Sequence, residues 1–299
     1  MINILSINKS FGDVKALNNF TCEVADGTVF GLVGSNGAGK STLLRILAGV
    51  IETDNGVVEI DGLEIFDNPI VRGSCFFIAD YPFFYNDSTV ENMAKLYEKI
   101  YPNWSKEKYA YLCNLFPIDK KARVINMSKG MQRQAALILA LSSKPKYLFM
   151  DEIFDGLDPV VRQLLKKLLM EEVAENKMTV IIASHNLREL EDVCDHVGLL
   201  HKGGILLEKE IDEMKLGIHK VQAAFLPAVG KEGFSDLNIV NFTQRGSLVN
   251  MVVRGNQEEI MRSLEKHNPV FAESLPLTLE EVFINEMEVA GYDINNITK

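Results

Sequence analysis

Hydrophobic residues follow two different periods along the middle of the chain. The segments 28–33, 146–150 and 179–184 consist mostly of consecutive apolar residues. Such runs are typical of strands that are buried on both faces of a sheet. After Asp158-Pro159, an N-cap followed by proline at the first helical position, apolar residues instead recur every three or four positions from Leu164 to Val173, which predicts a helix with one buried face. Because the two patterns alternate, we expect an α/β fold in which helices cover a mostly parallel sheet.

The first 141 residues contain two further kinds of segment. Short strands separated by Asp-Gly turns are predicted at 2–8, 17–24 and 57–60. A helical block follows from about residue 88 to 141, and serine residues at favourable positions are candidate N-caps for its three helices. These caps are Ser88, which opens the capping box 88–91, Ser105 and Ser128.

The pattern changes again after about Gly217. Strands are predicted at 221–226, 237–242 and 247–253, and helices at 257–266 and 279–289, the second opened by the capping box Thr278–Glu281. We interpret residues 218–299 as a small α+β domain and residues 1–217 as a larger α/β domain. A length of 299 residues agrees with two domains.

Charge and composition exclude some classes of protein. The chain has 31 Lys and Arg against 41 Asp and Glu, a net charge of -10, which argues against binding along nucleic acid. Its longest apolar helical run, 135–141, is far shorter than a membrane span. We find no pattern of an export signal at the N-terminus, and the four scattered cysteines suit a reducing cytosol. We therefore expect a cytoplasmic protein.

A glycine-rich segment directly after the first apolar run matches the pattern G-x-x-x-x-G-K-[ST]. Glycines allow successive backbone N–H groups to face phosphate oxygens, and the helix that follows adds positive charge at its N-terminus. Lys40 would contact the β- and γ-phosphates, and the Ser41 hydroxyl would bind Mg²⁺. The alternative is a strand-to-helix turn without a ligand. The predicted phosphate-binding residues are Gly34, Ser35, Asn36, Gly37, Ala38, Gly39, Lys40, Ser41 and Thr42.

Two acidic residues, Asp151 and Glu152, end the apolar run 147–150. At the carboxyl end of a buried strand, Asp151 suits Mg²⁺ binding, and Glu152 suits a general base that polarises the attacking water. By itself this pair could equally be a strand that runs into an acidic turn. The phosphate-binding pattern beside it favours the catalytic interpretation.

A third segment, Asn126–Gln134, lies about twenty residues before the acidic pair. On these motifs the chain resembles the nucleotide-binding subunit of an ATP-binding cassette (ABC) transporter, over roughly residues 1–217. Ser128 and Gly130 match the S-x-G of the family signature, which is usually written L-S-G-G-Q. A plain capped helix is the alternative. The resemblance implies a P-loop NTPase (RecA-like) core, an antiparallel β subdomain and a helical subdomain at about 83–142.

The resemblance also assigns roles to individual residues. His185 matches the switch histidine that contacts the γ-phosphate and orients Glu152. Asp158 belongs to the D-loop between two protomers, and Phe11 resembles the aromatic residue that stacks on adenine. For His185 and Phe11 the alternatives are a structural hydrogen bond and a core or loop aromatic. Asp80 stands where the family has a magnesium-bridging glutamine; the shorter carboxylate could still bind Mg²⁺ but would repel the γ-phosphate.

The signature departs from the family pattern at Lys129 and Met131, which we interpret as variation compatible with turnover. The resemblance implies an ATPase that binds ATP and Mg²⁺, dimerises head to tail with a second protomer that is either identical or different, and drives a separate transmembrane permease from the cytoplasmic face of the membrane. Helices around 81–104 would contact the permease, and the extension at 218–299 suggests an exporter of drugs or antimicrobial peptides of the bacitracin-resistance type. Alternatives are a non-transport ABC protein, a P-loop kinase or GTPase, and a silent binding module.

Overall fold

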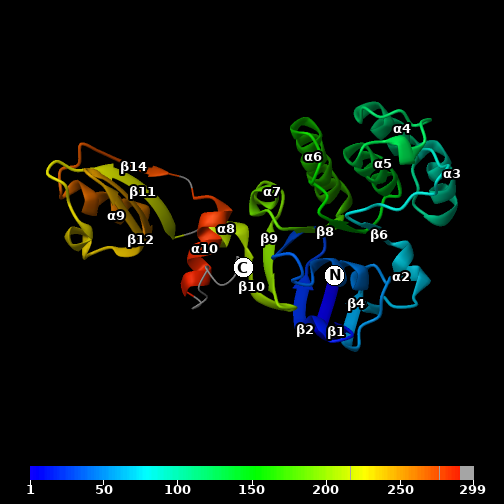
Figure 1. Cartoon of the computed structure of the whole chain (residues 1–299), viewed down its shortest axis with the longest axis horizontal. Coiled ribbons are helices and arrows are strands. Elements are labelled where there is room, and N and C mark those ends of the chain that lie inside the picture. The colour runs from blue at the N-terminus through cyan, green and yellow to red at the C-terminus, as the bar shows by residue number, and fades with distance from the viewer. Residues whose placement is uncertain (216, 276, 290–299) are drawn as a thin grey trace. The chain divides into compact units, whose positions relative to one another are not determined.

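The computed structural model describes residues 1–215, 217–275 and 277–289. The chain divides into two units, Met1–Glu208 and Lys209–Lys299 (Figure 1). The boundary that we expected after residue 217 therefore falls inside the second unit, beyond its short first helix α8 (Ile211–Lys215).

A six-stranded sheet forms the centre of the first unit. Five of its strands are parallel, and β3, β7 and β8 are buried along their whole length. This confirms the sheet that the apolar runs predicted. In spatial order the strands are β10 (Gly204–Glu210), β9 (His196–His201), β3 (Val29–Val33), β8 (Thr179–Ser184), β7 (Tyr147–Asp151) and β6 (Cys75–Ile78).

Helices cover this sheet, and a second sheet packs beyond one of them. The apolar face of α1 shares one hydrophobic core with the central sheet and with an antiparallel sheet, which has the order β2-β1-β4-β5. In Figure 1, α5, α6 and α7 lie on the opposite side of the central sheet from β1, β2 and β4. The bounds are β1 (Ile2–Phe11), β2 (Val14–Val24), β4 (Asn55–Ile60), β5 (Leu63–Glu64), α1 (Lys40–Leu47), α5 (Lys129–Ser142), α6 (Pro159–Asn176) and α7 (Leu187–Glu191).

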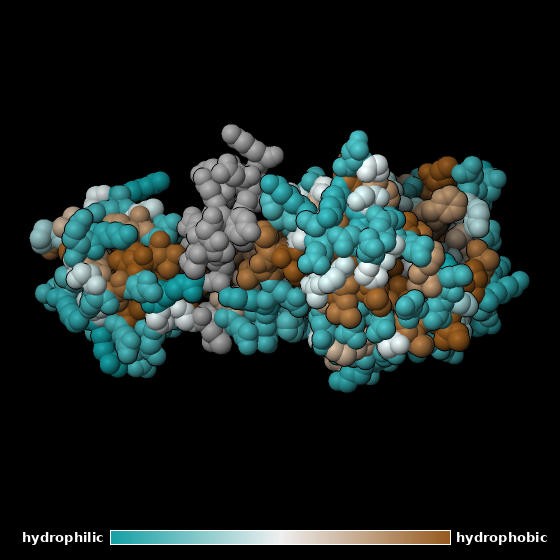
Figure 2. Space-filling model, turned by 90° about the horizontal axis from the view of Figure 1, so that it is seen from below, coloured by the Kyte–Doolittle hydropathy of each residue, from teal (hydrophilic) through white to brown (hydrophobic). Residues whose placement is uncertain are grey.

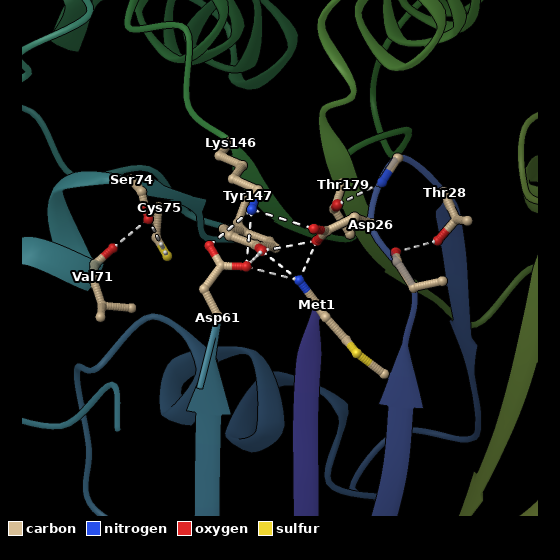
Figure 3. A network of polar contacts seen from close by, with 12 residues as sticks. Met1, Asp26, Thr28, Asp61, Val71, Ser74, Cys75, Lys146, Tyr147 and Thr179 are labelled. Carbon is tan, nitrogen blue, oxygen red and sulfur yellow. Dashed lines mark hydrogen bonds and ion pairs between the residues drawn. The ribbon is translucent and has the colours of Figure 1, made fainter. Parts of the chain in front are cut away.

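A network of charged groups joins the antiparallel sheet to β7 (Figure 3). The oxygen of the Tyr147 hydroxyl lies 2.8 Å from a carboxylate oxygen of Asp26 and 2.7 Å from one of Asp61, so the two acids share its single proton. Lys146 lies 2.8 Å from Asp61, and the amino group of Met1 contacts both acids. Burial alone would raise the pKa of Asp61, but hydrogen bonds from Lys146, Tyr147 and Met1 lower it to about 2. Asp26 and Asp61, the acidic residues of two Asp-Gly turns, therefore also join the antiparallel sheet to the central sheet.

Most of the N-caps predicted for the helical part of the first unit are confirmed. Ser105 and Ser128 accept hydrogen bonds from the backbone N–H groups of Lys108 (3.1 Å) and Met131 (3.2 Å), as expected. The Ser88 cap was wrong, because Thr89 caps the helix and Ser88 donates instead to a carbonyl in the preceding turn. Elements here are α2 (Pro69–Gly73), α3 (Val90–Ile100), α4 (Lys106–Leu115) and the 3₁₀ turn η1 (Val124–Asn126).

The second unit has its own sheet and core. Phe225, Phe234 and Leu264 pack between the sheet and α9. The capping box of the last helix is confirmed. The backbone N–H of Glu281 donates to the Thr278 hydroxyl at 3.2 Å, and the backbone N–H of Thr278 donates to the Glu281 carboxylate at 3.0 Å. Strand β14 was not predicted. The sheet order is β12 (Asn238–Arg245), β13 (Leu248–Arg254), β11 (Ile218–Ala224) and β14 (Phe271–Leu275), with η2 (Lys231–Phe234), α9 (Gln257–Glu265) and α10 (Leu279–Val289).

Among the described residues, no helix is both long and apolar enough to cross a membrane. Figure 2 shows hydrophobic groups as patches between hydrophilic ones on the face that it presents. The four cysteines are free, and three of them are buried. Burial raises the pKa of the Cys75 thiol to about 12, so this side chain behaves as a small apolar group.

Candidate nucleotide-binding site

The predicted site residues come from loops that follow adjacent strands. Strands β3, β8, β7 and β6 are parallel neighbours in this order, so their carboxyl ends lie at one edge of the sheet. The glycine-rich loop follows β3, His185 follows β8, Glu152 follows β7 and Asp80 follows β6. In open α/β sheets this edge is where ligands bind. The topology therefore gathers residues that lie far apart in the sequence.

At two positions of the glycine-rich loop there is no room for a side chain, so only glycine fits. A Cβ on Gly39, whose φ is +111°, would overlap the carbonyl oxygen of Ala16, and one on Gly34 would overlap that of Leu200. The loop between them, 35–37, is exposed, and α1 begins directly afterwards at Lys40. An exposed loop at a helix N-terminus, with close backbone packing behind it, is suited to phosphate oxygens.

Lys40 is only 5 % exposed and lies across the inner side of this loop. Its Nζ donates to the carbonyl oxygen of Gly34 at 2.5 Å and lies 3.6 Å from Oε1 of Glu152. Burial lowers the pKa of this amine, and the negative charges of Glu152 and Asp151 oppose that shift. The lysine is thus held between the loop and the acidic pair.

Asp151 and Ser41 form a second part of the site. Asp151 is 3 % exposed, and its Oδ1 has no hydrogen-bond partner within the described chain. Burial raises the pKa of Asp151, a hydrogen bond from Ser41 lowers it, and the charges of Glu152 and Asp80 raise it again. A buried carboxylate oxygen without a partner, next to a hydroxyl, is a donor set that fits Mg²⁺.

Glu152 directs its carboxylate toward His185. Its φ is +47°, an uncommon value for this residue, and its backbone N–H donates to the carbonyl of Ala183 at 2.9 Å. Oε2 of Glu152 accepts a hydrogen bond from Nδ1 of His185, also at 2.9 Å. An oxygen of Asp155 lies within 4.8 Å of these groups. Sequence reasoning missed Asp155, although its position three residues after Glu152 was a signal.

Four other predicted site residues lie in different local structures. Ser128 caps α5, and a Cβ on Gly130 would overlap the carbonyl oxygen of Gly156, so the signature segment packs on the loop after β7. Asp158 caps α6 by accepting from the backbone N–H groups of the next helical turn at 3.0 Å. Phe11 ends β1 and is 51 % exposed, with the amine of Lys9 5.7 Å from its ring.

Asp80 is paired with two basic residues of α5. Its Oδ1 contacts Nη2 of Arg133 and lies 3.4 Å from Nζ of Lys129. Arg133 is fully buried, and the same Nη2 donates to the backbone carbonyl of Asp80 at 3.2 Å. Sequence reasoning missed Arg133. The signal was a charged residue two positions before the apolar run 135–141 of the helix.

Comparison with known proteins identifies the family. Residues 17–155 match the ABC transporter family model. The ABC transporter ATP-binding protein YtrB of Bacillus subtilis is 30% identical over 95% of this chain and 97% of its own length. The bacitracin transport ATP-binding protein BcrA of Bacillus licheniformis is 32% identical over 72% of this chain and 71% of its own. A solved ATP-binding subunit of an ABC transporter is 26% identical, with a TM-score of 0.67 over 72% of this chain and 92% of that one. The chain therefore belongs to the ABC transporter ATP-binding proteins, and it is an ATPase.

Proposed function

We propose that this ATPase powers a separate transmembrane permease that exports drugs or antimicrobial peptides, and that it works as a head-to-tail dimer with two ATP molecules at the interface. The observation that carries the proposal is the connected set Lys40, Glu152 and His185, in which 3.6 Å and 2.9 Å contacts lie beside the buried carboxylate of Asp151. A glycine-rich loop without a catalytic purpose would not need this arrangement at one sheet edge.

Binding of ATP is assigned to the loop after β3. Backbone N–H groups of 34–42 and the ammonium of Lys40 hold the phosphates, and the exposed ring of Phe11 stacks on adenine. Lys40 gives up its contact with the Gly34 carbonyl when the phosphates provide stronger, charged acceptors. Ser41 and Asp151 hold Mg²⁺, which offsets phosphate charge when it is bound.

Hydrolysis is assigned to Glu152. One of its carboxylate oxygens orients a water molecule and accepts a proton as the water oxygen bonds to the γ-phosphorus. The bond from that phosphorus to the bridging oxygen breaks, and its electron pair stays on ADP. His185 holds the other oxygen through Nδ1, so the base enters the reaction already oriented. Release of that proton to solvent completes the cycle.

The second protomer supplies the other half of each site. Ser128 and Gly130 stand at the N-terminus of α5, whose first backbone N–H groups suit the γ-phosphate of ATP held by the partner. Asp158, in the loop that packs on Gly130, lies at the same junction. Closure on ATP would bring two copies together, and hydrolysis would remove the γ-phosphate that joins them.

The permease is assigned to the aromatic surface that follows β6. Phe83 and Tyr81 are 76 % and 74 % exposed, and they border a cavity of about 280 Å³ with aromatic walls. Exposed aromatic side chains around a hollow are typical of docking sites for a partner. A permease that docks there would hold the protein on the cytoplasmic face of the membrane. The similarity to BcrA, named for bacitracin transport, supports the choice of cargo.

Light scattering tests the dimer. In Glu152→Gln, which lacks the base, ATP should be trapped, and the 33.5 kDa mass should double only when ATP is present. Lys40→Ala in the same background should remain monomeric and is the control for nucleotide binding. A variant that binds ATP and never doubles would contradict the homodimer. Co-purification with a polytopic membrane protein tests the transport assignment, and an exporter requires that deletion of the gene sensitises cells to its cargo.

A further inference from the structure

Two departures from the family pattern, Asp80 and Lys129, meet in the structure. The carboxylate of Asp80 follows β6, and Lys129 stands in the first turn of α5, with its Nζ 3.4 Å from Oδ1 of Asp80 and 4.4 Å from the ring of Tyr81. Arg133, one turn further along the same helix, contacts the same Oδ1 and the backbone carbonyl of Asp80. We name Asp80, Lys129 and Arg133 the loop–helix charge cluster.

Arg133 is the buried member of this cluster. The residue is 0% exposed, whereas the side chains of Asp80 and Lys129 are 31% and 44% exposed. Its Nε and Nη1 have no hydrogen-bond partner in the described part of the chain, and a Cβ on Gly156 would lie 3.5 Å from Nη1. Asp80 therefore provides the compensating charge for a desolvated guanidinium, and such a cation is costly to leave unpaired.

The position of this pair matters for the ATP site. Asp80 lies at the same sheet edge as Asp151, close enough for its charge to act there. A free carboxylate at that point would repel phosphate or compete for Mg²⁺. Paired with Arg133, its charge is offset and its direction is fixed toward α5.

We propose that Arg133 is a positioning residue for ATP binding that acts through Asp80: the ion pair with buried Arg133 holds the carboxylate away from the phosphates and Mg²⁺, and joins the loop after β6 to the signature helix. The inference rests on the ATP site proposed above. It explains why Asp80 and Arg133 occur together, since each charge would be unfavourable without the other.

Binding of a fluorescent ATP analogue to the full chain tests the proposal, with Mg²⁺ and with EDTA. Arg133→Gln should weaken binding in Mg²⁺ roughly tenfold, because Asp80 then faces the phosphates unpaired. Addition of Asp80→Asn to that variant should restore binding to within about threefold of wild type, and Arg133→Lys should retain it. Additive losses in the double variant would overturn the proposal.

Asp80→Asn alone separates the proposal from magnesium binding by Asp80. We expect this variant to bind the analogue with Mg²⁺ at least as tightly as wild type, while thermal unfolding of the nucleotide-free protein shows a lower Tm, because buried Arg133 has lost its partner. Weaker binding with Mg²⁺, and unchanged binding in EDTA, would make Asp80 a metal ligand and overturn the proposal. This arm decides the question even if Arg133→Gln does not fold.

Two controls distinguish a failure of this proposal from a general loss of stability and from a failure of the proposed ATP site. Lys108 pairs at 2.5 Å with buried Glu172, fourteen positions along α6 from Asp158 and so about 20 Å away. Lys108→Gln should lower Tm without any effect on nucleotide affinity; an equal loss of affinity would show that the binding effects merely follow stability and would overturn the proposal. Failure of wild type to bind the analogue would instead contradict the proposed ATP site.

Discussion

Nδ1 of His185 lies 2.9 Å from Oε2 of Glu152, across two neighbouring strand ends that are 33 positions apart in the sequence. Glu152 has a left-handed backbone with a φ of +47°, and its backbone N–H joins the end of β7 to β8 by donating to the carbonyl of Ala183. His185 is half exposed, with 49% of its side chain accessible, whereas Glu152 is 14% accessible. The histidine can therefore respond to a ligand at the surface and transmit that change to the buried base.

His185→Ala should reduce ATP turnover by roughly a hundredfold or more and leave ATP affinity near wild type, since the base loses its orientation and not its charge. Phosphate release and binding of a fluorescent ATP analogue measure the two effects. Glu152→Gln should cause a similar loss. Because the two residues act as one unit, the double variant should be no slower than Glu152→Gln alone. Multiplicative losses would show that His185 works independently.

The polar network around Tyr147 gives a prediction for pH. The pKa of Asp61 is about 2 in the folded protein, below the ordinary value of 3.8, so folding favours the charged form. Its stabilising contribution is present above the ordinary pKa and is lost as the pH falls toward 2. Asp61→Asn should therefore lower Tm at pH 7, and the difference from wild type should shrink below about pH 4.

Thermal unfolding of both proteins across this pH range is the measurement. Asp87 also forms an ion pair, with Arg123 at 3.1 Å, but its side chain is 83% exposed. Asp87→Asn is therefore a matched control that should change Tm little at any pH. A difference between wild type and Asp61→Asn that stays constant down to pH 2 would show that the carboxylate charge is not responsible.

Local patterns were sufficient for the predictions that the structure confirms. Continuous apolar runs predicted the buried parallel strands, and Asp158 before Pro159 predicted the start of α6, because both signals act over a few residues. Strand β6 was missed. Its four residues pair only with β7, about seventy positions away, and so depend on tertiary contacts.

The same difference between local patterns and long-range contacts decides which residues of the candidate site could be predicted. Residues in contiguous motifs could be proposed from the sequence: the loop 34–42 from its glycine pattern, and the acidic pair from its place after an apolar run together with that loop. Arg133 was missed because its relevance lies in the ion pair with Asp80, 53 positions away, and Asp155 because its proximity to His185, 30 positions away, arises only in the fold. Asp80 was found only through alignment with a family pattern, and its pairing with a buried arginine had no signal at its own position.

Gly130→Ala should separate packing from chemistry at the signature segment. The added Cβ would overlap the carbonyl oxygen of Gly156, so the segment and the loop after β7 must move apart. Overpacking of this kind costs about 1–3 kcal/mol in the free energy of unfolding. Gly73→Ala is the control, because a Cβ there meets nothing within 4 Å at the end of α2. Denaturant unfolding measures both; equal stability of the two variants would contradict the close packing.

Substitutions of Asp158 can distinguish its role as the N-cap of α6 from its proposed role in the contact between protomers. Both capping bonds go to the same atom, Oδ1, at 3.0 Å. Asp158→Ala should lower the free energy of unfolding by about 1 kcal/mol, while Asp158→Asn, whose side-chain oxygen can still cap, should stay close to wild type. The asparagine variant nevertheless loses the charge that the proposed interface uses.

In the Glu152→Gln background, Asp158→Asn should therefore weaken ATP-dependent dimerisation while the unfolding transition is preserved. Light scattering over a series of protein concentrations gives the dimer affinity, and denaturant unfolding of the same samples gives the stability. Asn186 also caps a helix, accepting from the backbone N–H of Arg188 at 3.1 Å, and Asn186→Asp is the converse control, in which a cap gains charge. If Asp158→Asn dimerises as tightly as its parent, the carboxylate serves α6 alone, and the contact between protomers must come from other residues of this loop.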